Sequence, residues 1–187
     1  MAPGRVRIIG GEWRSRVLSF SDQQGLRPTP DRVRETLFNW LQFDVPGSRV
    51  LDCFAGSGAL AFEAASRGAS EVVMLENQAA AASDLQANMQ KLNAGQMRLQ
   101  QQDALAWLNR EAIQRFDLVF LDPPYQSDLL QQAANLLTRR RWLANHAKIY
   151  VETGREVNAA ALLPPDWRQL KSKQAGQVGY SLWQWSE

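Results

Sequence analysis

The segment with the clearest chemical potential is Asp122-Pro123-Pro124-Tyr125, which directly follows an apolar run at residues 116–121. An exocyclic amine on a nucleobase carries two N–H donors, and the Asp122 carboxylate and the Pro123 carbonyl can accept from both. The prolines fix φ and carry no N–H, so they stiffen the loop. The Tyr125 ring offers a face on which a base can stack. The segment predicts a site for the amino group of an unstacked base, although a rigid turn that merely ends a strand is the alternative.

A second candidate segment, Asp52-x-x-x-Gly56-x-Gly58, overlaps and follows an apolar run at residues 50–54. Glycines let the backbone approach a ligand closely, and the helix that follows presents free amides and its positive end. The spacing Gly56-x-Gly58-x-x-Ala61 also partly fits the dinucleotide fingerprint. A carboxylate at Asp52 would meet the phosphates of a dinucleotide as anion against anion, so Asp52 favours a cationic ligand. A tight strand-to-helix turn is the structural alternative.

Two more acids follow the next two predicted strands. Glu76 ends the apolar run at residues 72–75, where an acid can accept from both hydroxyls of a ribose. Asp103 follows a weaker strand at residues 97–101 and can accept from an adenine amino group. Either acid alone could instead cap a helix or be solvated. A cationic group, a ribose and an adenine together describe S-adenosylmethionine.

The elements that must position these acids alternate between strands and helices. Strands are predicted at residues 50–54, 72–75, 97–101, 116–121 and 148–151, and helices at 59–67, 78–92, 105–110 and 128–143. This alternation requires parallel pairing with right-handed crossovers, hence a doubly wound α/β sheet. Residues 167–173 and 178–185 predict a closing antiparallel hairpin, which makes the sheet seven-stranded and mostly parallel. Ligands of such sheets bind beyond the carboxyl ends of the strands, where the candidate acids lie.

The basic residues of the chain are concentrated near its N-terminus. Residues 1–34 hold seven arginines against three acids, whereas the whole 187-residue chain has a net charge of only +2. Residues 1–20 alternate around Gly10-Gly11 as a hairpin would, and a helix is predicted at 32–41. We therefore expect an N-terminal arm at residues 1–47 that meets nucleic-acid phosphate, followed by a catalytic domain at 48–187. A solvated basic hairpin is the alternative.

The composition excludes several classes of protein. With 187 residues, 45% of them hydrophobic, the chain can bury about 70% of its unfolded surface as one domain without a metal or disulfide staple. No apolar run approaches the roughly 18 residues of a membrane span, and the N-terminus lacks the apolar core of a signal peptide. Cys53 is the single cysteine, which suits a reducing cytosol and predicts a cytoplasmic protein. The sequence predicts no metal site.

The two site motifs together resemble amino-group methyltransferases that depend on S-adenosylmethionine. The opening segments at residues 7–16, 26–29 and 31–40 narrow the resemblance to the bacterial 16S rRNA guanine-N2 methyltransferases of type D, the RsmD family. The match runs nearly the whole chain, including Gly176-x-x-Gly179-Tyr180. It implies a Rossmann-like class I methyltransferase fold. It also implies methylation of a guanine N2 amine in 16S rRNA of the assembled or assembling small ribosomal subunit, and we expect a monomer.

The resemblance also implies roles for individual residues. Asp122, Pro123, Pro124 and Tyr125 would form the catalytic segment. The cofactor would be bound by Asp52, Phe54, Ala55, Gly56, Ser57, Gly58, Glu76, Asn77, Asp103 and Ala104, with Arg27 and Thr29 closing its pocket from the N-terminal side. Arg5, Arg7, Arg14 and Arg16 would contact rRNA phosphate, and Trp13 beside them is a candidate for stacking on RNA.

The expected reaction is direct in-line transfer, without a covalent intermediate. Cys53 lies inside the predicted cofactor strand and is expected to be a small buried residue rather than a nucleophile. Three alternatives stay open at this stage. The chain could methylate adenine N6 in RNA or DNA, because the same motif serves that amine. It could also be a nicotinamide oxidoreductase, or an RNA-binding subunit without catalytic activity.

Overall fold

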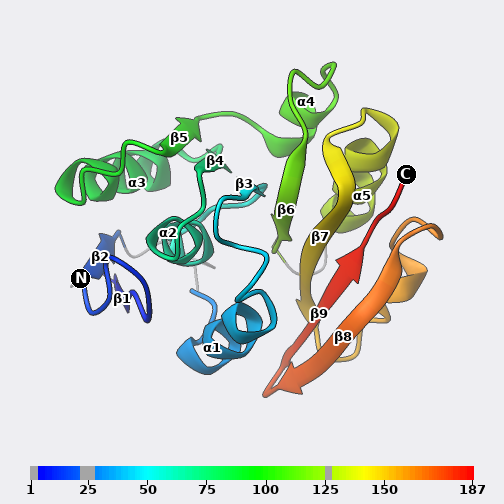
Figure 1. Cartoon of the computed structure of the whole chain (residues 1–187), viewed down its shortest axis with the longest axis horizontal. Coiled ribbons are helices and arrows are strands. Elements are labelled where there is room, and N and C mark those ends of the chain that lie inside the picture. The colour runs from blue at the N-terminus through cyan, green and yellow to red at the C-terminus, as the bar shows by residue number, and fades with distance from the viewer. Residues whose placement is uncertain (1–3, 22–27, 125–127) are drawn as a thin grey trace.

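A seven-stranded sheet forms the centre of the computed structural model, which describes residues 4–21, 28–124 and 128–187. The strand order is β5-β4-β3-β6-β7-β9-β8 (Figure 1). All neighbours pair in parallel except β9, which is antiparallel to both β7 and β8. The strands are β3 Arg49–Asp52, β4 Glu71–Leu75, β5 Met97–Gln100, β6 Phe116–Leu121, β7 Leu143–Gly154, β8 Arg168–Ala175 and β9 Val178–Gln184. The predicted doubly wound sheet with a closing hairpin is confirmed.

Helices cover both faces of the sheet and bury two separate cores. Along β6, Leu118 and Phe120 face one core, whereas Val119 and Leu121 face the other. This two-sided burial explains why the strand reads as a nearly continuous apolar run. Helices α1, α2 and α3 pack on the first core and α4 and α5 on the second. They span α1 Asp31–Trp40, α2 Ala59–Ser66, α3 Ala79–Lys91, α4 Ala104–Leu108 and α5 Leu129–Arg139, and a short 3₁₀ turn, η1, covers Ala159–Ala161.

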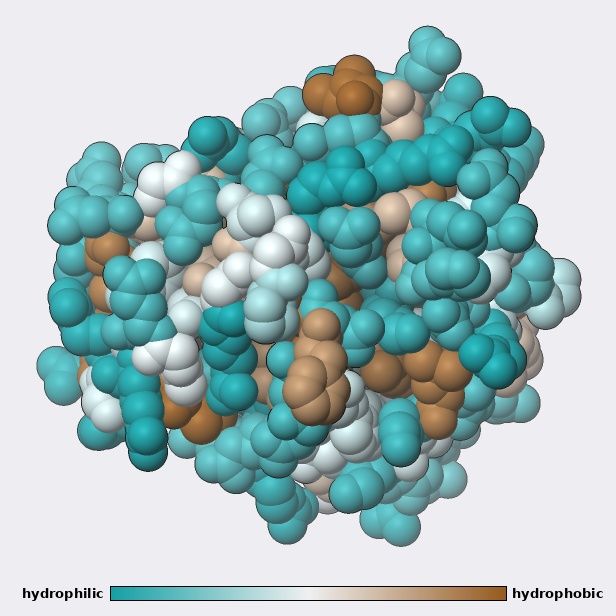
Figure 2. All heavy atoms as spheres, viewed as in Figure 1, coloured by the Kyte–Doolittle hydropathy of each residue, from teal (hydrophilic) through white to brown (hydrophobic). Residues whose placement is uncertain are grey.

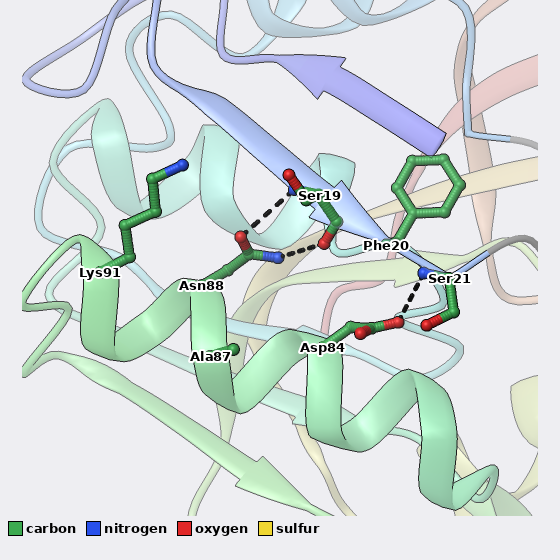
Figure 3. Close-up of a pocket in the computed structure, with 7 residues that line it drawn as sticks. All are labelled: Ser19, Phe20, Ser21, Asp84, Ala87, Asn88 and Lys91. Carbon is green, nitrogen blue, oxygen red and sulfur yellow. Dashed lines mark hydrogen bonds between the residues drawn. The ribbon is translucent and has the colours of Figure 1, made fainter. Parts of the chain in front are cut away.

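The N-terminal arm begins with a separate two-stranded antiparallel hairpin, β1 Gly4–Arg7 and β2 Val17–Phe20. Figure 3 shows how β2 docks on α3. The Asn88 side chain donates to the Ser19 carbonyl (2.9 Å) and accepts from its amide (3.3 Å), and the Ser21 amide donates to Asp84 (2.7 Å). The hollow of about 260 Å³ at this junction is lined by none of the predicted site residues.

A buried ion-pair network fastens the other end of the hairpin to α2. The Glu63 carboxylate accepts from the amides of Ile9 (2.9 Å) and Gly10 (2.8 Å). It also accepts from the guanidinium groups of Arg34 (3.2 Å) and Arg67 (2.8 Å). Both Glu63 and Arg34 are completely buried, and their hydrogen bonds replace the lost solvation. The arm is therefore held against the sheet domain by polar contacts in the interior.

The expected role of Trp13 in RNA stacking is wrong. Trp13 is only 6% exposed and lies beside Phe62 of α2, with ring centroids 6.3 Å apart. Its amide donates to the Ser66 hydroxyl at 2.9 Å. The indole belongs to the contact between the arm and α2, so it has no face available to a base.

The predicted helix at 128–143 extends too far. Helix α5 ends at Arg139, and Arg141 has a φ of +62°, which a helix cannot continue. Trp142 instead stacks on Trp107 at 4.2 Å, and its indole donates to the Leu108 carbonyl. Trp142 fits the helical spacing of apolar residues, but it packs on α4 rather than continuing α5. Strand β7 starts at the next residue.

Hydrophilic residues dominate the face of the molecule shown in Figure 2, and its apolar patches are small and separate. Within the described residues, no helix is long and apolar enough to cross a membrane. The same residues contain no group of three or more His, Cys, Asp or Glu side chains that could hold a metal ion.

Candidate active site

Four carboxylates meet at the carboxyl ends of four adjacent strands. Asp52 ends β3, where it pairs in register with Met74 of β4 and Phe120 of β6, so Glu76 and Asp122 each lie two residues beyond a neighbour of Asp52. Glu152 of β7 follows Val151, the register partner of Leu121, and thus stands next to Asp122. We call these residues, Asp52, Glu76, Asp122 and Glu152, the acidic edge.

The loop between β3 and α2 needs glycine for its conformation. Gly56 has a φ of +53° and Gly58 a φ of +79°, in the left-handed region that glycine adopts without penalty. A Cβ on Gly58 would lie 2.6 Å from Leu85 of α3. The turn itself closes through a hydrogen bond from the Gly58 amide to the Ala55 carbonyl (2.7 Å). Part of the glycine signal is therefore structural, as the alternative interpretation held.

The Gly56 amide already has an acidic partner in the protein. It donates to one oxygen of Glu76 (3.0 Å), whose other oxygen accepts from the Gln78 amide (2.8 Å). A dinucleotide-binding loop would turn such amides toward pyrophosphate. Here a carboxylate occupies that position, so a pyrophosphate would meet like charge. The geometry argues against the nicotinamide alternative.

Burial and neighbouring charge hold Asp52 close to its protonated form. Its side chain is 2% exposed, and loss of solvation raises its pKa to about 7. A hydrogen bond from the Phe54 amide opposes this rise, and the negative charge of Glu76 adds to it. A bound cation would favour the ionised carboxylate and pull the pKa back down.

Asp122 is partly buried and stands among other acids. Loss of solvation is the largest cause that raises its pKa well above the usual value, followed by the charges of Glu152 and Asp52. The Thr29 hydroxyl lies 3.5 Å from Asp122 Oδ2 and opposes that rise. Pro123, directly after Asp122, is buried, whereas Pro124 is exposed.

A family model described as Conserved hypothetical protein 95 matches residues 6–184 of the chain. Proteins named Ribosomal RNA small subunit methyltransferase D are 45% identical over 181 residues in Escherichia coli and 46% identical over 186 residues in Haemophilus influenzae. The first alignment covers 97% of this chain and 90% of the relative, and the second covers 98% and 95%. The chain belongs to this family.

A solved structure supports the same relationship. The structure titled as putative methyltransferase yhhF from Escherichia coli superposes with a TM-score of 0.89 at 41% identity. The superposition covers 98% of this chain and 99% of that one. The family fold therefore extends over the arm and the closing hairpin as well as over the sheet, as the sequence resemblance implied.

The other predicted site residues differ in exposure, and two of them lie outside the described residues. Asp103 is exposed and caps α4 by accepting from the Ala106 amide (2.8 Å), so it already has the structural role of the alternative interpretation. Arg27 and Tyr125 lie outside the described residues. Phe54 is partly exposed, Asn77 is exposed, and Ala55, Ser57 and Ala104 are buried. Cys53 is buried, as expected, and burial raises the pKa of its thiol well above the usual value.

Sequence reasoning missed two residues around Thr29. Glu152 follows the apolar strand residues Tyr150 and Val151 as Asp122 follows its own strand, so the rule applied to the earlier strands would have found it. Arg34 lies within the apolar stripe of α1, and a charged side chain in such a stripe signals a buried partner. Its Nε donates to the Thr29 carbonyl at 3.2 Å.

Proposed function

We propose that this chain transfers the methyl group of S-adenosylmethionine to the exocyclic N2 amine of a guanine in 16S rRNA. The acidic edge carries the proposal, because its adjacent carboxylates favour a cationic ligand. Burial is the main cause that raises the pKa of Asp52 and Asp122, and the neighbouring carboxylates add to the rise. S-adenosylmethionine carries a sulfonium and an ammonium group. Family membership and the names of the relatives support a small-subunit rRNA substrate.

Each part of the cofactor has a proposed partner in or near the acidic edge. Asp52 and the loop from Phe54 to Gly58 would hold the methionine portion, and Glu76 with Asn77 would accept from the ribose. Asp103, despite its capping role, keeps a second carboxylate oxygen that can face the adenine beside Ala104. Thr29 and Arg27 would close the pocket from the arm. When bound, the cofactor supplies an electrophilic methyl carbon whose bond to sulfur breaks as its bond to the base nitrogen forms.

The protein contributes positioning and charge stabilisation to this transfer. Asp122 and the Pro123 carbonyl would accept the two N–H groups of the amine and aim its lone pair at the methyl carbon. Positive charge develops on the nitrogen as it gains a substituent, and the Asp122 carboxylate stabilises that charge and takes the released proton. Tyr125 would stack on the base, which must first leave its own stack. The proposed transfer is direct and forms no covalent intermediate with the protein. Cys53 is buried and has no part in it.

The arm at residues 1–47 would bring the RNA to this site, and residues 48–187 would form the catalytic domain. Arg5, Arg7, Arg14 and Arg16 are all exposed and are proposed to contact phosphate. We further propose that a monomer acts in the cytoplasm on the assembled or assembling small subunit. Target choice would depend on the arm and on the shape of the particle.

The role of Asp122 is tested by transfer of radiolabelled methyl groups to small subunits from cells that lack base methylation. Asp122→Ala removes one of the two amine acceptors, and we expect at least about a 100-fold loss in transfer rate. Calorimetry should show cofactor affinity within a few-fold of wild type. Exposed Asp44→Ala is the matched control and should retain full activity. Full activity in Asp122→Ala would contradict the proposed role.

A further inference from the structure

Thr29 places one hydroxyl between two carboxylates of the acidic edge. Its Oγ1 lies 3.3 Å from Glu152 Oε2 and 3.5 Å from Asp122 Oδ2. A hydroxyl carries a single proton, so it can donate to only one of these carboxylates at a time. Whether the Glu152 carboxylate accepts the Thr29 proton therefore decides whether Thr29 can donate to Asp122.

The surroundings hold this arrangement in place. Glu152 is only 4% exposed, and the Tyr150 hydroxyl donates to the same Oε2 at 2.9 Å. On the other side, Thr29 is buried and its carbonyl accepts from Arg34, which is itself paired with Glu63. Thr29 is thus fixed both through its backbone and through its hydroxyl, as a group that positions another side chain must be.

We propose that Glu152 is a positioning residue of the methyl-transfer site, which acts on Asp122 through the hydroxyl of Thr29 and through its own charge. This inference rests on the proposed function and adds a residue to it. Glu152 fixes the direction of the Asp122 carboxylate and sets the pH at which that carboxylate is ionised and able to accept the base amine.

The charges that face Asp122 fix the direction of the expected effects. Glu152 from β7 and Asp52 from β3 raise the Asp122 pKa, whereas the Thr29 hydroxyl lowers it. Glu76, directly after β4, raises the pKa of Asp52, and we expect the cationic cofactor at saturation to favour the ionised form of Asp52 in every assay. The transfer rate should therefore fall on the acidic side as Asp122 takes up a proton. We call this fall the acidic limb of the pH–rate profile. Removal of the Glu152 charge should move the acidic limb to lower pH, and removal of the Thr29 hydroxyl should move it to higher pH.

The test measures single-turnover methyl transfer to small subunits from about pH 5 to pH 9 with saturating cofactor. Glu152→Gln keeps the shape of the side chain and removes its charge, so the acidic limb should move to lower pH by about half a unit or more. Thr29→Val keeps the shape and removes the hydroxyl, so the limb should move to higher pH. Thr29→Ser restores the hydroxyl and should return the limb to its wild-type position.

Exposed Glu156→Gln on the loop after β7 is the matched control for lost charge, and its limb should stay in place. The inference would be overturned if the acidic limb does not move in Glu152→Gln. It would also be overturned if the limb moves in the same direction in Glu152→Gln and Thr29→Val. If Glu152→Gln does not fold, Thr29→Val decides alone, and an unmoved limb there overturns it. If the wild type transfers no methyl group, the proposed function fails instead, so the two failures are distinguishable.

Discussion

At the scale of single residues, burial of the Asp52 carboxylate lowers the stability of the fold at neutral pH. Its pKa rises from 3.8 to about 7 because the carboxylate is buried, with a further contribution from Glu76. The folded state therefore holds this proton more tightly than the unfolded chain. The resulting stability is fully present below pH 3.8 and is lost as the pH rises through about 7.

Asp52→Asn should consequently stabilise the protein while it impairs cofactor binding. A neutral amide avoids burial of a charge, so the free energy of unfolding at pH 8 should rise by about 1–4 kcal/mol. Denaturant unfolding should show a gain that grows from about pH 4 to about pH 7, so the gain at pH 5 should be smaller than the gain at pH 8. Calorimetry with S-adenosylmethionine should show at least about a tenfold loss in affinity. A variant that is less stable at pH 8, or that binds the cofactor unchanged, would disagree with this account.

At the scale of elements, the β1–β2 hairpin exposes arginines to solvent while polar contacts attach it to α2. Arg5 and Arg7 flank buried Val6 on β1, so they share the outer face of the hairpin, while Glu63 holds the backbone that follows. Arg34 of α1 takes part in the same attachment by donating to the Arg7 carbonyl and to Glu63, and Thr29 lies two residues before that helix begins at Asp31. The arm that is proposed to contact RNA therefore also supplies Thr29 to the acidic edge.

Replacement of both Arg5 and Arg7 by Ala should weaken RNA binding without affecting the cofactor site. The slope of log affinity against log salt should become shallower by about one to two, because two phosphate contacts are lost. Filter binding over a salt series measures this slope, and calorimetry should show unchanged cofactor affinity. Arg155→Ala with Arg168→Ala, two exposed arginines of the closing region, is the matched control. An equal loss in that control would show that the arm has no special role.

Much of the element arrangement could be predicted because strand periodicity and helix periodicity differ. The β6 strand was predicted with its observed bounds, and Asp52, Glu76 and Asp122 were placed at one edge of the sheet. The buried partnership of Arg34 and Glu63 joins residues 29 positions apart, which periodicity does not report. The end of α5 was missed because Trp142 fits a helical stripe but packs on Trp107 instead.

At the scale of the whole molecule, the net charge of +2 conceals two regions of opposite sign. A basic arm lies beside a sheet whose carboxyl edge carries buried acids. This arrangement fits a protein that approaches an RNA surface and receives a cationic cofactor and a base amine. In the proposed function, the arm would meet the RNA and the carboxyl edge of the adjacent sheet would bind the cofactor.

The central claim is that this chain methylates a guanine N2 amine in 16S rRNA. The most direct measurement is transfer of labelled methyl groups from S-adenosylmethionine to small subunits that lack base methylation, followed by digestion to nucleosides. The account predicts that the label elutes as N2-methylguanosine from 16S rRNA. Label in N6-methyladenosine, or no transfer to small subunits at any stage of assembly, would contradict it.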